Sequence, residues 1–149
     1  MEVQIKRMHE DVQLPEYAKP GDSGMDLRAY VLDMGYGPII RLHSGDVQII
    51  PTGIQVAIPL GYEGQIRLRS SLGALGLAIP NGIGTIDSGY RGELRVILMN
   101  LTHDTIPIEH GERIAQFIVA PVEHVRFKEV NRLPTSSRGE GGFGHTGRD

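Results

Sequence analysis

Two polar stretches in the first half of this chain carry residue types that could bind an anion or a metal ion. In PGDSGMDLRA, Asp26 stands between two apolar residues, so its side chain faces away from any core that they contact. In RLRSSLG, Arg69 directly precedes Ser70 and Ser71. An arginine beside hydroxyls and free backbone N–H groups suits a phosphate. The residues alone leave other interpretations open, because Asp26 could be a solvated strand residue and either serine could cap a helix.

Two further stretches could act on a bound substrate. NGIGTIDSGYRGEL gathers Asp87 and Tyr90 around a glycine-bearing turn. Asp87 could be a general base with Tyr90 as a flat wall beside it, or it could only stabilise the turn. Spacing does not decide between these. In HGERIAQF, Gln116 lies on a predicted strand and needs a hydrogen-bond partner if that face is buried, from the backbone or from a ligand.

The elements that must position these residues are short strands. Runs of apolar residues, bounded by Gly, Pro, Asn or Asp, predict an all-β sandwich, barrel or jelly roll with one short helical turn at residues 70–77. The apolar pattern ends near residue 130. This predicts a domain over residues 1–130 and a mobile, glycine-rich C-terminal arm over residues 131–149. The expected strands are residues 3–8, 25–30, 46–52, 54–59, 64–70, 76–80, 93–100, 104–110, 113–122 and 125–130.

Composition limits the class of protein. With 149 residues, 40% of them hydrophobic and 22% charged, the chain is expected to form one soluble domain. The absence of cysteine excludes disulfides and thiolate chemistry. Together with the lack of a targeting or membrane-length segment, it predicts a cytoplasmic protein. The net charge of -3 argues against a nucleic-acid partner, although a local arginine cluster could still bind a small polyanion. The six histidines are scattered, which argues against a zinc site.

Taken in order, these stretches resemble the signature segments of the trimeric dUTPase family. PGDSGMDLRA, RSSLG, GTIDSGYRGEL, GERIAQF and RGEGGFGHTG correspond to its five segments and span residues 22–147. The resemblance implies a jelly-roll-like homotrimer that uses Mg²⁺ to hydrolyse dUTP to dUMP and pyrophosphate. This reaction limits uracil incorporation into DNA and supplies dUMP for dTTP synthesis. In the family, one subunit supplies the first, second and fourth segments of an active site, another the third, and the last its C-terminal arm.

The resemblance also implies a role for each matching residue. Asp87 would activate the attacking water as the catalytic residue, and Asp26 would hold a water in the magnesium shell. The implied substrate contacts are Arg69, Ser70, Ser71 and Gln116 at the phosphates, Asn81 and Phe143 at uracil, Tyr90 at the deoxyribose, and Arg138, Gly144, His145 and Thr146 on the arm at the γ-phosphate.

Two positions depart from the family pattern, and they bear on the alternatives. Ser71 stands where the family more often has glycine, and His145 where serine usually precedes the threonine. The alternative is a dCTP deaminase-related enzyme, monofunctional or bifunctional, whose helical segment is similar to RSSLGALGL. That family typically has an arginine where Ala74 stands, so the Asp87–Tyr90 pair and the glycine-rich arm favour the dUTPase. A non-catalytic binding protein on the same scaffold would be expected to have lost Asp87, Arg69 or Phe143, and the sequence keeps all three.

Overall fold

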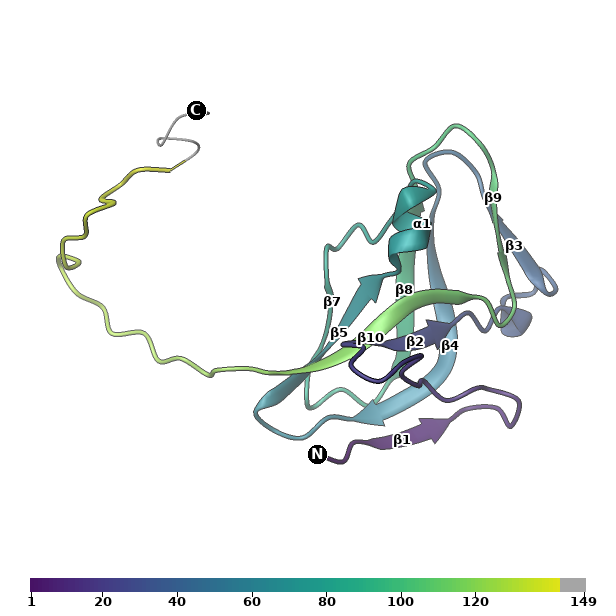
Figure 1. Ribbon diagram of the computed structural model, residues 1–149, viewed down its shortest axis with the longest axis horizontal. Helices are drawn as coiled ribbons and strands as arrows, with labels where there is room; N and C mark the ends of the chain where they lie inside the picture. Colours follow the sequence, from purple (N-terminus) through teal and green to yellow (C-terminus); the bar gives the residue numbers. More distant parts are fainter. Residues whose placement is uncertain (143–149) are drawn as a thin grey trace.

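The computed structural model describes residues 1–142, which form an all-β, jelly-roll-like fold with one short α-helix, as the sequence predicts (Figure 1). Two antiparallel four-stranded sheets contain most of the strands, and a separate pair of strands lies at one end. The first sheet has the order β1 (Gln4–Arg7), β4 (Val47–Ala57), β8 (Glu93–Asn100), β6 (Leu77–Ala78). The second has the order β2 (Met25–Arg28), β10 (Arg113–Pro121), β5 (Tyr62–Leu68), β7 (Gly84–Ile86). The separate pair is β3 (Ile39–Leu42) with β9 (Ile106–Glu109), and the helical segments are η1 (Leu32–Met34) and α1 (Ser70–Ala74).

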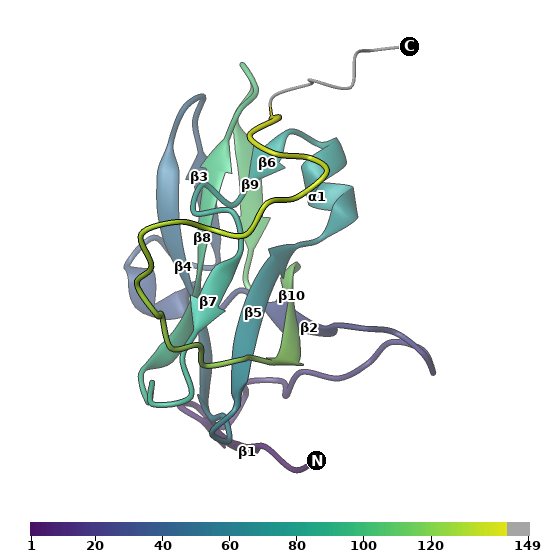
Figure 2. The ribbon, with the colours of Figure 1, turned by 90° about the vertical axis from the view of Figure 1, so that its left-hand side faces the viewer.

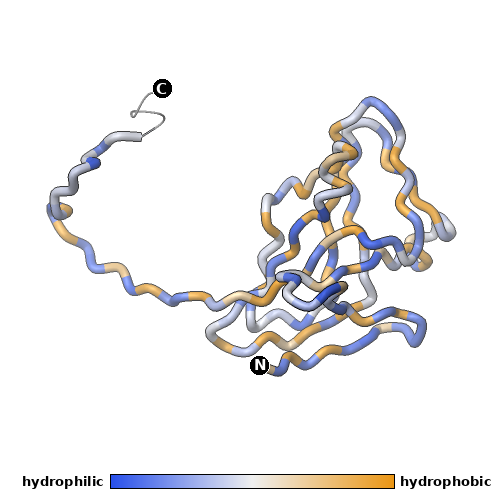
Figure 3. Tube along the Cα trace, in the orientation of Figure 1, coloured by the Kyte–Doolittle hydropathy of each residue, from blue (hydrophilic) through white to orange (hydrophobic). Residues whose placement is uncertain are grey.

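The hydrophobic core lies between the two four-stranded sheets. Figure 2 shows β4 and β8 on one side of the molecule and β5, β10 and β2 on the other. In β8, Leu94, Val96 and Leu98 are fully buried while Arg95 between them is exposed, the alternation of a strand with one face in the core. Figure 3 shows the same alternation of apolar and polar positions along other strands. Burying each such side chain stabilises the fold by roughly 1.5–3 kcal/mol, so the core fixes the strands that carry the polar residues.

The expected strands at residues 46–52 and 54–59 are one strand, β4, with an irregularity in its pairing to β8. The register shifts between Pro51 and Gln55, and Gly53 in between has a φ of 69°. A Cβ at Gly53 would collide with the side chain of Val12, so only glycine fits this bulge. The sequence Pro-Thr-Gly therefore bends the strand here and does not end it.

One further expected strand is absent from the structure, and one observed strand was not predicted. The expected strand at residues 125–130 is absent, because this segment extends away from the sheets and pairs with no strand of the described part of the chain (Figure 1). Its Phe127 is 96% exposed. Conversely, β3 was not predicted, because four residues carry too little periodicity and the strand depends on its pairing with distant β9. Within residues 1–142, no helix is long and apolar enough to cross a membrane.

Candidate active site

Asp26 lies in an ion-paired group with two arginines, which we call the Asp26 cluster: Asp26, Arg69 and Arg113. Arg69 Nε lies 3.0 Å from Asp26 Oδ1, and Arg113 Nη1 donates to Asp26 Oδ2 at 3.1 Å. The side chain of Asp26 is only 10% exposed. The interpretation of Asp26 as a solvated strand residue is therefore wrong, because β10 and the end of β5 bring two guanidinium groups to its strand.

The two oxygens of the Asp26 carboxylate differ in their contacts. Arg69 is within ion-pair distance of Oδ1, but it does not direct an N–H at that oxygen, which is buried and has no hydrogen-bond partner within residues 1–142. A buried acceptor of this kind is unusual and fits a further donor, such as a metal-bound water. Among residues 1–142, no three or more acidic or histidine side chains gather to hold a metal directly. Because Mg²⁺ retains several waters, one carboxylate reaching it through water fits this donor set.

Gln116 joins the same face of the second sheet. The register places Gln116 on β10 directly opposite Asp26 on β2 and opposite Arg67 on β5, so all three side chains point to one side. Gly24 lets β10 come close, since a Cβ there would lie 2.9 Å from Gln116 Cβ. The structure thus brings together three of the residues that sequence reasoning selected, Asp26, Arg69 and Gln116.

Ser70 and Ser71 begin helix α1, and both are exposed. The N-cap position belongs to Arg69, whose backbone is extended, and no side chain caps the helix. The capping interpretation of the two serines is therefore wrong. The Arg69 carbonyl accepts the N–H groups of Leu72 and Gly73, which leaves the hydroxyls and the N–H groups of both serines outside the hydrogen bonds of the helix.

A second group of predicted residues lines a pocket of about 250 Å³ between β7, β8 and the turn that joins them, which we call the hairpin pocket. The two strands around this turn were expected to form a hairpin, but they do not pair, because β7 pairs with β5 in one sheet and β8 with β4 and β6 in the other. Asn81, Asp87 and Tyr90 all line it. Tyr90 is held in place, because its hydroxyl donates to the Glu93 carbonyl at 3.0 Å and its ring covers Gly92, where a Cβ would overlap it. The pocket therefore has an aromatic wall of fixed orientation.

The Asp87 side chain is exposed, and within residues 1–142 its carboxylate accepts no hydrogen bond. The turn is held by other groups: Tyr90 N donates to the Asp87 carbonyl at 3.0 Å, and Arg91 Nη1 donates to the Ser88 carbonyl at 2.8 Å. A turn-stabilising role for the Asp87 carboxylate therefore finds no support, and its oxygens are open to a ligand or water.

Within residues 1–142, these two groups do not line a common pocket. The residues that line the hairpin pocket include none of Asp26, Arg69 and Gln116. Arg138 belongs to the arm, a segment that extends away from the sheets (Figure 1), and its Nε donates to the Gly141 carbonyl at 2.9 Å. The predicted arm residues Phe143, Gly144, His145 and Thr146 lie outside the described residues.

Sequence reasoning missed several polar residues of these groups, and two of them make well-defined contacts. Arg113 contacts Asp26 from 87 positions away, although it stands in the same GERIAQF stretch as Gln116. Glu93 binds the β4 bulge, where one carboxylate oxygen accepts the Gly53 N–H at 2.8 Å and the other accepts Arg95 Nε at 2.9 Å. The only feature of the sequence that could have singled out Glu93 is its position in the same stretch as Asp87 and Tyr90.

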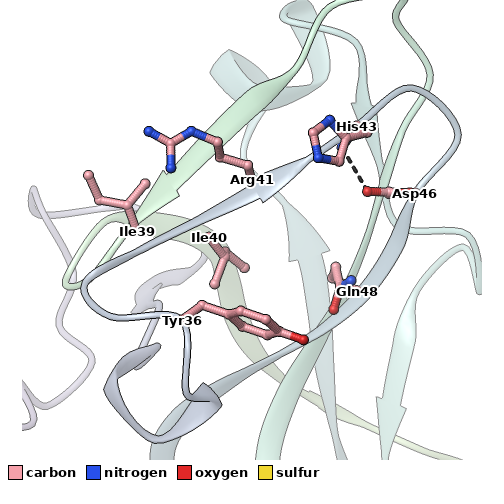
Figure 4. Close-up of a pocket in the computed structure, with 7 residues that line it drawn as sticks. All are labelled: Tyr36, Ile39, Ile40, Arg41, His43, Asp46 and Gln48. Carbon is pink, nitrogen blue, oxygen red and sulfur yellow. Dashed lines mark hydrogen bonds between the residues drawn. The ribbon is translucent and has the colours of Figure 1, made fainter.

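Another pocket, of about 370 Å³, contains none of the predicted residues (Figure 4). It lies between Tyr36, β3 and the start of β4. Its polar groups serve the local turn, since the Asp46 carboxylate accepts the His43 N–H at 2.8 Å and His43 Nδ1 lies 3.1 Å from Thr105 Oγ1. The volume of a pocket therefore does not identify the candidate active site. The hairpin pocket differs from this one in containing the Asp87 carboxylate, which accepts no hydrogen bond within residues 1–142.

The fold and the two polar groups together define an all-β protein equipped for an anionic ligand with a flat, partly apolar portion. The dUTPase family model matches residues 10–147, and the chain belongs to this family. It is 48% identical to the deoxyuridine 5'-triphosphate nucleotidohydrolase of Streptomyces coelicolor, over 99% of this chain and 78% of that protein. It is 46% identical to the enzyme of the same name from Fusobacterium nucleatum, over 98% of each. The structure of Staphylococcus bacteriophage 80alpha dUTPase with dUPNHPP is similar to this fold with a TM-score of 0.84, 27% identity and 98% coverage of both chains.

Proposed function

We propose that this protein is a dUTP diphosphatase, which hydrolyses dUTP to dUMP and pyrophosphate. The observation that carries the proposal is the unengaged Asp87 carboxylate beside the fixed Tyr90 ring, in a chain of the dUTPase family. The reaction removes a precursor of uracil in DNA and supplies dUMP for dTTP synthesis. A cytoplasmic location remains a prediction of the sequence.

Asp87 would act as the general base that orients and activates the attacking water at the α-phosphate. Its carboxylate is exposed at the pocket and accepts no other hydrogen bond within residues 1–142, so a water can approach it. General-base catalysis by a positioned carboxylate contributes roughly 10²–10⁴-fold to the rate.

The Asp26 cluster would hold the phosphates. Arg69 offers a guanidinium, and Ser70 and Ser71 offer hydroxyls and N–H groups at the start of α1. Gln116 offers an unengaged amide on the same face of the sheet as Asp26. Mg²⁺, when bound with the nucleotide, supplies charge neutralisation at the phosphates, and Asp26 would contact it through a water.

The hairpin pocket would hold the nucleoside. The Tyr90 ring would lie against the deoxyribose and leave no room for a 2′-hydroxyl, while Asn81 would hydrogen-bond the edge of uracil. A pocket that pairs polar groups with uracil rejects cytosine, because an unpaired buried polar group costs about 1–3 kcal/mol.

The outer face of the first sheet supports assembly into a homotrimer. Val47 and Ile49 on β4 are 51% and 54% exposed and pair directly with Met99 and Ile97 on β8. These four side chains form an apolar stripe on the side of the sheet opposite the core, and such a stripe is typical of a contact between subunits. Ile97 also lines the hairpin pocket. A neighbouring subunit on this stripe would therefore lie beside the hairpin pocket and could supply its own Asp26 cluster, whose residues do not line the pocket within one chain's described residues.

The arm would complete the site of another subunit. Val125 and Phe127 are exposed and alternate with charged residues along a segment that lies away from the sheets (Figures 1 and 3). On its own subunit, this segment buries neither of these apolar side chains. It could carry Arg138 and the predicted uracil-stacking residue Phe143 to a neighbour.

Deletion of residues from Ser136 onward tests this role of the arm. We expect turnover of dUTP to fall by about 10³-fold or more, because the deletion removes Arg138 and the residues predicted to cover the nucleotide. The truncated protein should remain trimeric by light scattering, since residues 125–130 and the apolar stripe are retained. A monomeric product would contradict the proposal and make the arm a structural tie.

Pyrophosphate release from dUTP, dCTP, dTTP and UTP in the presence of Mg²⁺ tests the proposed function. We expect turnover of dUTP alone, without ammonia release from dCTP, which the dCTP deaminase alternative requires. Asp87→Asn should retain nucleotide binding and lose at least about 10²-fold in turnover. Asp104→Asn, an exposed aspartate outside both groups, is the matched control. Equal turnover of all four nucleotides, or an unaffected Asp87→Asn variant, would overturn the assignment.

A further inference from the structure

The contacts within the Asp26 cluster are not the contacts that its residues would make with a bound nucleotide. Arg69 is paired with Asp26 at 3.0 Å, yet the proposed function requires Arg69 to bind a phosphate and Asp26 to bind a metal-bound water. We propose that nucleotide binding exchanges these partners: Arg69 leaves Asp26 for a phosphate, and Asp26 Oδ1 is released to the metal-bound water. This inference rests on the proposed function and concerns how the site loads its substrate.

The two arginine contacts of Asp26 are unequal, which determines which one is exchanged. Arg113 Nη1 makes a directed hydrogen bond to Oδ2 at 3.1 Å. Arg69 Nε is close to Oδ1 but does not direct an N–H at it, so this contact is Coulombic without a hydrogen bond. Breaking the Arg69 contact therefore costs less, and Arg113 is the positioning residue that keeps the carboxylate in place.

The positions of the groups allow the exchange. Arg69 stands at the start of α1, next to the unengaged hydroxyls and N–H groups of Ser70 and Ser71, and its side chain is 26% exposed. A small rotation of the guanidinium would place it with the serines. Asp26 is much less exposed and sits within a strand, so it cannot follow.

The charges make the exchange depend on metal. Asp26 and the two arginines together carry one net positive charge, because one carboxylate stands between two guanidinium groups. If a nucleotide binds without metal, it draws Arg69 away and leaves the buried Oδ1 facing an anion. Without a cation this repulsion opposes binding, and with Mg²⁺ the same oxygen becomes a hydrogen-bond acceptor for its water. Asp26 therefore weakens the binding of metal-free nucleotide and strengthens the binding of the nucleotide with Mg²⁺.

One variant should therefore change the affinity for nucleotide in opposite directions with and without metal. Asp26→Asn removes the negative charge and frees Arg69. Its affinity for the hydrolysis-resistant analogue dUpNHpp should therefore rise by about fivefold in EDTA, the effect of one nearby charge at the protein surface. In Mg²⁺, its affinity should fall by about tenfold relative to wild type, because the carboxylate acceptor is lost. A residue that only supports the fold would weaken binding in both conditions.

Isothermal titration of dUpNHpp into the full-length protein, in EDTA and in Mg²⁺, measures both affinities. Glu109→Gln removes one negative charge from an exposed position on β9 and is the matched control, expected to bind as wild type in both conditions. Tighter binding of Asp26→Asn in EDTA together with weaker binding in Mg²⁺ supports the exchange. Weaker or unchanged binding in EDTA overturns it and leaves the proposed function intact, whereas failure of wild type to bind in either condition overturns both.

A second measurement on the unmodified protein covers the case in which Asp26→Asn does not fold. The Nε–H resonances of Arg69 and Arg113, assigned by substitution of each arginine with lysine, are followed by NMR as dUpNHpp and Mg²⁺ are added. The exchange predicts a large shift for Arg69 and a small one for Arg113. Equal shifts, or a shift confined to Arg113, would overturn it.

Discussion

The Asp26 cluster and the hairpin pocket each place an aspartate among polar residues, but the two carboxylates are in opposite situations. The Asp26 side chain is 10% exposed and lies between two arginines from distant parts of the chain. Asp87 is exposed, and within residues 1–142 its carboxylate accepts no hydrogen bond. Asp26 is paired with two arginines of its own subunit. The Asp87 carboxylate has no partner within residues 1–142 and is open to an outside molecule.

This difference assigns different tasks to two chemically identical side chains. Asp26 Oδ2 accepts a hydrogen bond from Arg113, and Oδ1 lies beside the Arg69 guanidinium, so this carboxylate suits orientation and charge balance. The unengaged lone pairs of Asp87 can accept a proton from an attacking water. Under the proposed function, Asp26 would belong to the region that binds the phosphates, and Asp87 would act once a ligand and a neighbouring subunit are in place.

Substitution of Tyr90 tests whether the hairpin pocket selects the sugar. Tyr90→Ala removes the wall over Gly92, so the ratio of kcat/KM for dUTP to that for UTP should fall by about 10–100-fold. Tyr90→Phe keeps the ring and loses only the hydrogen bond to the Glu93 carbonyl, so it should retain most of the selectivity. Loss of turnover in Tyr90→Ala with an unchanged ratio would show that the ring only supports the turn.

The free energies of unfolding of two alanine variants test whether Asp26 is ion-paired within the subunit and Asp87 is not. The expected changes are small. Asp26→Ala leaves Arg69 and Arg113 without their shared partner, so it should lower the free energy of unfolding by about 1–2 kcal/mol. Asp87→Ala removes no internal contact within the described residues and should change it by less than about 0.5 kcal/mol. Urea unfolding at one fixed protein concentration measures both. Equal losses would mean that Asp87 is also part of the internal structure.

Local patterns were sufficient for much of the fold, and they failed where a partner is distant. The run ELRVILMN was predicted as a strand with its observed bounds, because its alternation is complete within eight residues. The segment at residues 125–130 has a similar alternation but no strand of its own chain to pair with. Motif order selected Asp26, Arg69 and Gln116, and the structure brings them together. The contact of Asp26 with Arg113 depends on the pairing of β2 with β10, which no local pattern shows.

The central claim is that the phosphate-binding group and the hairpin pocket of one active site come from different subunits. The most direct test mixes two inactive variants, Arg69→Ala and Asp87→Asn, by unfolding and refolding them together. If subunits share sites, random assembly places an intact phosphate-binding group beside an intact pocket in about a quarter of the sites. We therefore predict about a quarter of wild-type turnover from the mixture. Turnover no higher than that of the separate variants, in trimers shown by tagged purification to contain both chains, would contradict the claim.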